Sequence, residues 1–201
     1  MTRNRPHIPR PEADYGPNRT ILMYWPNSRF HGWAYLQIRL RSPEEDEAYD
    51  GSYDWYEKNM LHSEISYLSD TYSQIVDALI ALAEGAEEAS AFADMEPDRA
   101  EFRFVRKPGP ETPVALKIFD WCPEHYVDGQ RVYSYDHPWW AEEIGTEREI
   151  ALKHLMDDVL SIGAALKDRF GEEGYRRAWG PRLPVTALAK LQALREMQDR
   201  T

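Results

Sequence analysis

The chain has 201 residues, of which 42% are hydrophobic and 29% are charged, as expected for one globular domain with its own core. Its 24 basic and 35 acidic residues give a formal net charge of −11. This charge argues against binding to bare nucleic acid or to an anionic membrane, because both require basic patches. Residues 1–41 hold seven bases and two acids and residues 171–201 hold six and four, so residues 42–170 carry −18. An acidic middle favours solubility, and it would also attract a basic partner.

The single cysteine, Cys122, cannot form an internal disulfide, which excludes a disulfide-stapled secreted fold. No apolar run approaches the roughly 20 residues needed to span a bilayer. The first 19 residues contain arginines and prolines but lack the apolar segment of a signal peptide. We therefore expect a flexible N-terminal arm over residues 1–19, a single domain over residues 20–201 and a cytoplasmic location.

The first regular segments of the chain are predicted to be strands. Residues 21–25 form a short apolar run that a Pro-Asn turn ends. Residues 33–41 alternate between apolar and polar side chains, which predicts a half-buried strand with one solvated face. Residues 43–57 contain seven acids and no base, so self-repulsion favours a loop there.

A helix is predicted next, from an N-cap at Asp70 to about Glu84. Its apolar residues recur at helical spacing, and Gly85 suits the position just after the helix. Four strands follow, at residues 89–94, 100–107, 113–121 and 130–135. Their short connections predict antiparallel hairpins. The residues expected to share one core beneath the long helix described next are Leu36, Ile38, Phe102, Phe104, Leu116 and Ile118.

Two helices are predicted at the C-terminal end. Thr146 and Glu149 have the spacing of a capping box, and a wide apolar stripe runs behind them from Leu152 to Phe170. Gly171 is expected to end this long helix, and a last helix is expected from Pro184. Consecutive strands rather than alternating strands and helices indicate an α+β fold, a mainly antiparallel sheet with the long helix and further helices packed on one face.

The sequence contains no recognisable catalytic or nucleotide-binding motif. The glycine-rich loops of dinucleotide-binding and P-loop proteins are missing, as are the H-E-x-x-H and G-x-S-x-G signatures. With 35 acids in the chain, two carboxylates close in sequence do not identify an acid–base pair. We therefore assign no catalytic residue and no cofactor-binding residue.

One group of residues resembles a metal site in composition. Cys122, His125 and His137 could supply three zinc ligands, with Glu124 as a base. A structural zinc site would need four such ligands, and the chain has no second cysteine. We favour the alternative, a loop at the end of a strand with incidental polar residues, and we predict that no metal is bound.

The stretch from Tyr133 to Trp140 reads YSYDHPWW and is rich in aromatic side chains. It is either a hydrophobic floor under the long helix or a surface for a partner. The acidic stretch 43–57 also has aromatics among its acids, a composition suited to binding a basic protein. We expect Trp140 to serve packing. The predicted partner-binding residues are Asp46, Glu47, Asp50, Asp54, Trp55, Asp136 and Trp139.

A compact, acidic α+β chain without catalytic motifs resembles the immunity proteins of bacterial polymorphic and contact-dependent toxin systems. The segment from Phe170 to Tyr175, FGEEGY, with Trp179-Gly180 and Pro184 after it, also resembles a tail of small bacterial proteins. The resemblance implies a non-catalytic, stoichiometric inhibitor of a basic toxin domain, and it assigns no residue a role. Two alternatives stay open. One is a small-molecule-binding protein or enzyme with a pocket between sheet and helices, and the other is an oligomeric structural or regulatory protein.

Overall fold

The structure is a computed structural model. It describes residues 70–94, 99–109, 111–121 and 148–200, together with the strands at 22–26, 33–39, 60–66, 124–127, 130–133 and 141–143. The predicted arm over residues 1–19 and the acidic stretch 43–57 lie outside the described residues.

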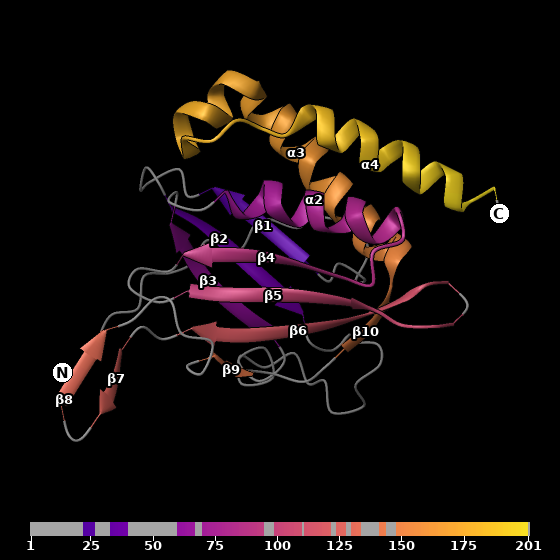
Figure 1. The fold of residues 1–201 in the computed structure, drawn as a ribbon. Coiled ribbons are helices and arrows are strands. Elements are labelled where there is room, and N and C mark those ends of the chain that lie inside the picture. The colour runs from indigo at the N-terminus through magenta and orange to yellow at the C-terminus, as the bar shows by residue number, and fades with distance from the viewer. Residues whose placement is uncertain are drawn as a thin grey trace, which may run out of the picture.

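The described strands form three antiparallel sheets (Figure 1). The first sheet has the order β1-β2-β3, formed by Leu22–Pro26, Trp33–Arg39 and Met60–Ser66. The second has the order β10-β6-β5-β4, formed by Arg148–Ala151, Pro113–Trp121, Arg99–Arg106 and Glu88–Asp94. The short strand β9, Ala141–Glu143, also pairs with β6. The third is a two-stranded ribbon of β7 and β8, Glu124–Val127 and Gln130–Tyr133, at the lower left of Figure 1.

Three helices lie on one side of strands β4, β5 and β6 (Figure 1). The first, α2 (Thr71–Ala83), packs on β4, and α4 (Val185–Gln198) packs on α2 and α3. The long helix α3 (Leu152–Trp179) contacts β10 and also β1 of the first sheet. The predicted α+β fold with an antiparallel sheet and helices on one face is confirmed. Within the described part of the chain, no helix combines the length and apolar character needed to cross a membrane.

Local signals determine α2 as predicted. The carboxylate of Asp70 accepts a hydrogen bond from the backbone amide of Ser73 at 3.4 Å, the arrangement of an N-cap. Gly85 follows the helix with φ +105°, a conformation that favours glycine. Between these ends, Tyr72, Ile75 and Leu79 are fully buried on the face that meets the rest of the core.

The start of α3 differs from the prediction. Residues 148–151, which include Glu149 of the predicted capping box, form β10, and the helix begins at Leu152 after an N-cap residue without a side-chain cap. The physical reason is strand pairing. Ile150 pairs with Val114 of β6, and both residues are buried, so a distant strand overrides the local helix signal.

The end of the long helix also differs. Gly171 has φ 61° and ψ 174°, which interrupts helical geometry as a stop signal would. The chain then resumes its helical course to Trp179 because Tyr175 and Trp179 bury their rings completely in the core. The interruption is therefore a kink within α3.

The core between sheet and helices contains the predicted residues of β5 and β6 whose side chains are described. Phe102, Phe104 and Leu116 are buried beneath the helices. The strands β4, β5, β6 and β8 lie where the alternation placed them. The side chains of Leu36, Ile38 and Ile118 lie outside the described residues, and the strand of Leu36 and Ile38 belongs to the separate first sheet.

Candidate functional site

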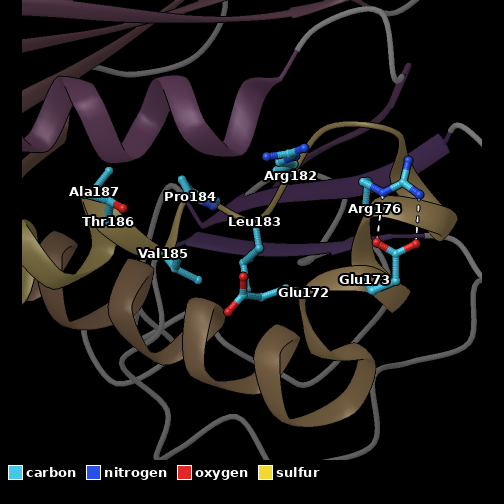
Figure 2. Close-up of a pocket in the computed structure, with 9 residues that line it drawn as sticks. All are labelled: Glu172, Glu173, Arg176, Arg182, Leu183, Pro184, Val185, Thr186 and Ala187. Atoms are coloured by element: carbon cyan, nitrogen blue, oxygen red, sulfur yellow. Dashed lines mark hydrogen bonds and ion pairs between the residues drawn. The ribbon is translucent and has the colours of Figure 1, made fainter.

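A pocket of about 670 Å³ lies where α3 ends and α4 begins (Figure 2). Two glycines shape it, the kink at Gly171 and Gly180 with φ 104°, which ends the helix. Leu183 is buried and anchors the connection between the helices. The lining residues are Glu172, Glu173, Arg176, Arg182, Leu183, Pro184, Val185, Thr186 and Ala187.

One ion pair dominates the charged side of this pocket. The guanidinium of Arg176 donates to both carboxylate oxygens of Glu173, at 2.8 Å and 3.0 Å (Figure 2). The hydrogen bond from Arg176 holds the pKa of Glu173 below its usual range, and the charges of Arg176, Arg177 and Arg182 act in the same direction. Glu173 therefore stays ionised at neutral pH and is a poor general acid.

The opposite wall of the pocket is the first turn of α4. The N-cap residue Pro184 provides no side-chain cap, and the amide of Val185 donates to the carbonyl of Leu183 at 2.8 Å. The positive end of this helix and Arg182 line the same pocket as Glu172 and Glu173. This mixed, open pocket can hold a polar group by ion pairing, and among the described residues that line it there is neither His nor Cys.

A second polar cluster lies on the sheet, on the face turned away from the helices. Glu101 is only 4% exposed, and its carboxylate accepts hydrogen bonds from Ser90 Oγ at 2.8 Å and from Arg103 Nε at 2.9 Å. The guanidinium of Arg103 lies over the ring of Phe119, 4.4 Å from its centre. Donors and a paired charge satisfy the buried carboxylate, so this cluster holds Glu101 in one position.

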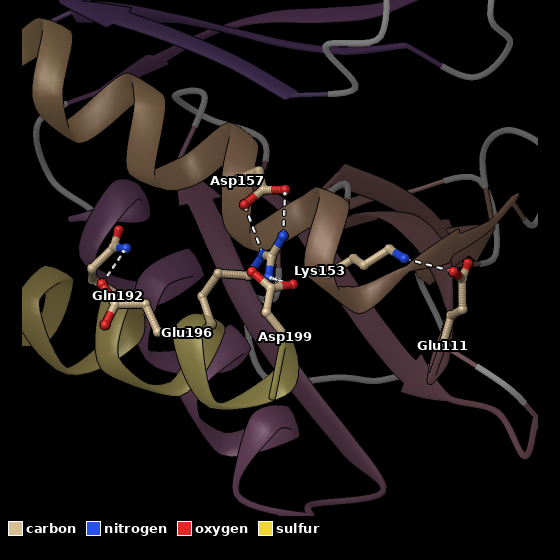
Figure 3. A network of polar contacts seen from close by, with 7 residues as sticks. Glu111, Lys153, Asp157, Gln192, Glu196 and Asp199 are labelled. Carbon is tan, nitrogen blue, oxygen red and sulfur yellow. Dashed lines mark hydrogen bonds and ion pairs between the residues drawn. The ribbon is translucent and has the colours of Figure 1, made fainter. Parts of the chain in front are cut away.

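A third set of polar contacts joins the helices (Figure 3). Arg195 of α4 donates to both carboxylate oxygens of Asp157 in α3, at 2.8 Å and 3.2 Å, and forms an ion pair with Asp199. The hydrogen bonds that Arg195 donates to Asp157 and Asp199 raise the pKa of Arg195 above its ordinary value, so it remains charged. These contacts fix α4 on α3 and, with it, one wall of the pocket.

None of the seven predicted partner-binding residues can be compared with this geometry. Asp46, Glu47, Asp50, Asp54 and Trp55 lie outside the described residues. The same holds for Asp136 and Trp139. The sequence did not predict the pocket of Figure 2. Its charged residues lie near the C-terminal end of α3, at Glu172, Glu173 and Arg176, and in the connection to α4, at Arg182. The usable signal was the spacing of Glu173 and Arg176, three apart on one helix.

The side chains of the three candidate metal ligands lie outside the described residues. Cys122 and His137 lie outside the described residues, and His125 is described only as part of strand β7. Among the side chains that are described, no group of three or more His, Cys, Asp or Glu residues is placed to hold a metal ion. The absence of a bound metal stays a prediction.

Comparison with protein-family models, with curated proteins and with solved structures gave no match. The resemblance to immunity proteins therefore rests on the architecture and on the short C-terminal segment alone. Any functional conclusion has to come from the charges and geometry of this chain.

Proposed function

We propose that this chain is a non-catalytic protein-binding module, an immunity-type inhibitor that binds a basic partner such as a toxin domain one to one in the cytoplasm. The observation that supports this proposal is the connection between β2 and β3. These strands are antiparallel neighbours with Arg39 opposite Met60, so residues 40–59 link two adjacent strand ends. Hairpin loops usually have about two to five residues, and much longer connections are usually functional or disordered.

This connection carries the acidic stretch 43–57 with five of the predicted contact residues: Asp46, Glu47, Asp50, Asp54 and Trp55. The part of the chain whose side chains the structure describes is nearly balanced in charge by comparison. Residues 70–94, 99–109, 111–117 and 149–200 hold 16 acids and 14 bases, so the other residues hold 19 acids and 10 bases. The excess of acid therefore belongs to the rest of the chain, which includes the acidic stretch 43–57. Such a distribution suits steering of a basic partner onto those segments.

Asp136 and Trp139 lie in the connection between β8 and β9. Strand β9 pairs with β6 of the second sheet, with Glu143 opposite Phe119, which anchors one end of this connection. Aromatic side chains supply much of the binding energy at protein interfaces. Trp139 is proposed as an anchor for the partner, as is Trp55.

The test begins with the purified chain as bait in a lysate of its native cells, followed by binding kinetics with the recovered protein. Substituting Asp46, Glu47, Asp50 and Asp54 together by their amides should lower the on-rate and leave the melting temperature unchanged. The on-rate should also fall between 0.1 M and 1 M salt, because the Debye length shrinks from ~10 Å to ~3 Å. An acidic partner, or an affinity indifferent to both changes, would contradict the proposal.

A matched control neutralises four exposed acids outside the pocket of Figure 2: Asp77, Glu87, Asp168 and Glu196. This control changes the net charge equally, so an equal loss of on-rate would show that only total charge matters. Trp55→Ala should raise the off-rate, at a cost of about 2 kcal/mol in affinity for a true anchor. Trp140→Ala should instead lower the melting temperature, since Trp140 is expected to serve packing.

The pocket of Figure 2 supports a second candidate, the binding of a small polar molecule. Its volume of about 670 Å³ lies within the usual range of small-molecule sites. A ligand from a panel of small charged metabolites should then raise the melting temperature of the wild type but not of Arg182→Ala. This result would favour the second candidate, whereas no shift with any compound would count against it.

A further inference from the structure

The turn between β5 and β6 has an unusual backbone. The amide of Lys107 donates to the carbonyl of Pro113 at 2.7 Å and closes the turn. Glu111 and Thr112 then have φ values of 64° and 50°, in the left-handed region. Non-glycine residues adopt this region rarely, and a β-branched residue such as threonine is disfavoured there. Such a conformation persists only where the surrounding contacts impose it.

One of those contacts is the hydrogen bond between Lys107 and Pro113 within the hairpin, and the others come from the start of α3. The backbone amide of Leu152 donates to the carbonyl of Thr112 at 3.1 Å, and Lys153 Nζ lies 2.5 Å from a carboxylate oxygen of Glu111 (Figure 3). The helix has no cap of its own, because the N-cap residue Ala151 lacks a polar side chain. The two strained residues therefore supply, from a distant turn, both a hydrogen-bond acceptor and a negative charge for the N-terminus of α3.

We propose that Glu111 and Thr112 of the β5–β6 turn form a strained latch that holds the first turn of α3 closed. While Glu111 is paired with Lys153, the left-handed backbone is maintained and Leu152 keeps its acceptor. When the pair separates, the turn relaxes toward ordinary backbone angles, and the first turn of α3 loses its cap and frays. The side chains of Lys153 and Glu111 are 32% and 58% exposed, so solvent ions or a competing cation can reach the pair.

The latch makes opposite predictions for two neighbouring residues. Glu111→Gln removes the charge that closes the latch and leaves the backbone strain, so opening becomes easier. Thr112→Asn places a residue that tolerates left-handed angles at the strained position, so the closed form becomes easier to maintain. If the ion pair of Glu111 and Lys153 acted without any link to the backbone strain, Glu111→Gln would still speed hydrogen exchange at the start of α3. Thr112→Asn would then leave that exchange unchanged.

The experiment is hydrogen exchange on the full chain, followed at the amides of Leu152 and Met156 by NMR. In Glu111→Gln both amides should exchange about two- to fivefold faster, as expected for loss of an exposed ion pair. In Thr112→Asn they should exchange more slowly than in the wild type. Raising salt from 0.1 M to 1 M should accelerate exchange in the wild type but not in Glu111→Gln, a comparison that needs no further variant.

A matched control is Glu173→Gln, which removes another exposed ion pair of α3, that with Arg176 near the opposite end of the helix. It should leave exchange at Leu152 and Met156 unchanged. Unchanged exchange in Glu111→Gln would overturn the latch. So would faster or unchanged exchange in Thr112→Asn, because the stored strain would then play no part in opening.

Discussion

The hydroxyl of Tyr72 occupies the space that a side chain at Gly163 would need. A Cβ atom at Gly163 would lie 2.7 Å from Tyr72 Oη and 2.8 Å from Leu188 Cδ1. Tyr72 belongs to α2, Gly163 to α3 and Leu188 to α4, so all three helices meet at this glycine. The hydroxyl also donates to the carbonyl of Val159 at 2.8 Å, which holds the ring in place. Close approach of the helices therefore depends on the missing side chain.

Gly163→Ala should destabilise the protein by about 1–3 kcal/mol, the usual effect of overpacking a close-packed core. Urea unfolding measures the loss. Tyr72→Phe alone should cost about 1 kcal/mol, because it removes one buried hydrogen bond. Combined with Gly163→Ala it should restore part of the stability, since the nearest clashing atom is then gone. Strictly additive losses would show that the helices do not meet as described.

The sequence was most informative where local signals decide the structure. The helix from Asp70 to Gly85 needed only a cap, an apolar periodicity and a glycine, and it lies where these signals placed it. The start of α3 could not be predicted from local signals. The residues before it form β10, and this strand depends on pairing with β6, more than 30 residues earlier in the chain. The same limit applies to β3, which pairs with β2 across the long acidic connection.

In the candidate sites, too, the sequence reveals the local features and not those that depend on long-range contacts. The pair of Glu173 and Arg176 has helical spacing and was visible in the sequence, but its pocket depends on how α4 packs back on α3. The strained angles of Glu111 and Thr112 have no sequence signal at all, since neither residue type suits the left-handed region. The contacts of that turn with the start of α3 are long-range, and only the folded chain reveals them.

Leu116→Ala should destabilise the protein by about 2–5 kcal/mol, the usual cost of truncating a buried aliphatic side chain. Leu116 is buried in the core of β6, between Phe104 of β5 and Arg148 of β10 in the strand register. Met197→Ala provides the control. This methionine is the large hydrophobic residue that α4 leaves 51% exposed, and its truncation should change stability by less than about 0.5 kcal/mol. Equal losses for both variants, measured by urea unfolding, would contradict the described core.

Asp70 provides a test by pH. Burial raises the pKa of its carboxyl above the ordinary value of 3.8, although the hydrogen bond from Ser73 opposes this. Ionisation of Asp70 therefore weakens folding at neutral pH, and this penalty disappears as the pH falls through the raised folded pKa to below 3.8. Asn caps a helix as well as Asp does and carries no charge.

Asp70→Asn should accordingly equal or exceed the wild type in stability at pH 7 and lose that advantage by pH 3.5. Asp70→Ala should be less stable than Asp70→Asn at every pH, by about 1 kcal/mol, because it lacks a cap altogether. Chemical denaturation of the three proteins across this pH range gives the comparison. An advantage of Asp70→Asn that grows on acidification would show that the carboxylate is stabilised by its surroundings.

Gly171 tests the kink of α3 by a different physical effect from that at Gly163. A Cβ atom at Gly171 would have no atom within 4 Å, so a substitution meets no steric clash with the surroundings. Its cost comes from the backbone alone, because φ 61° with ψ 174° is a conformation that essentially only glycine adopts.

Gly171→Ala should therefore destabilise the protein by about 1–3 kcal/mol. Gly171→Asn should not rescue it, since asparagine tolerates the left-handed helical region but not this value of ψ. The near-ultraviolet circular dichroism of the protein should change in both variants if the chain straightens there, because Trp179 is buried beyond the kink. A full recovery with asparagine would mean that residue 171 has left-handed helical angles and that the kink is differently built.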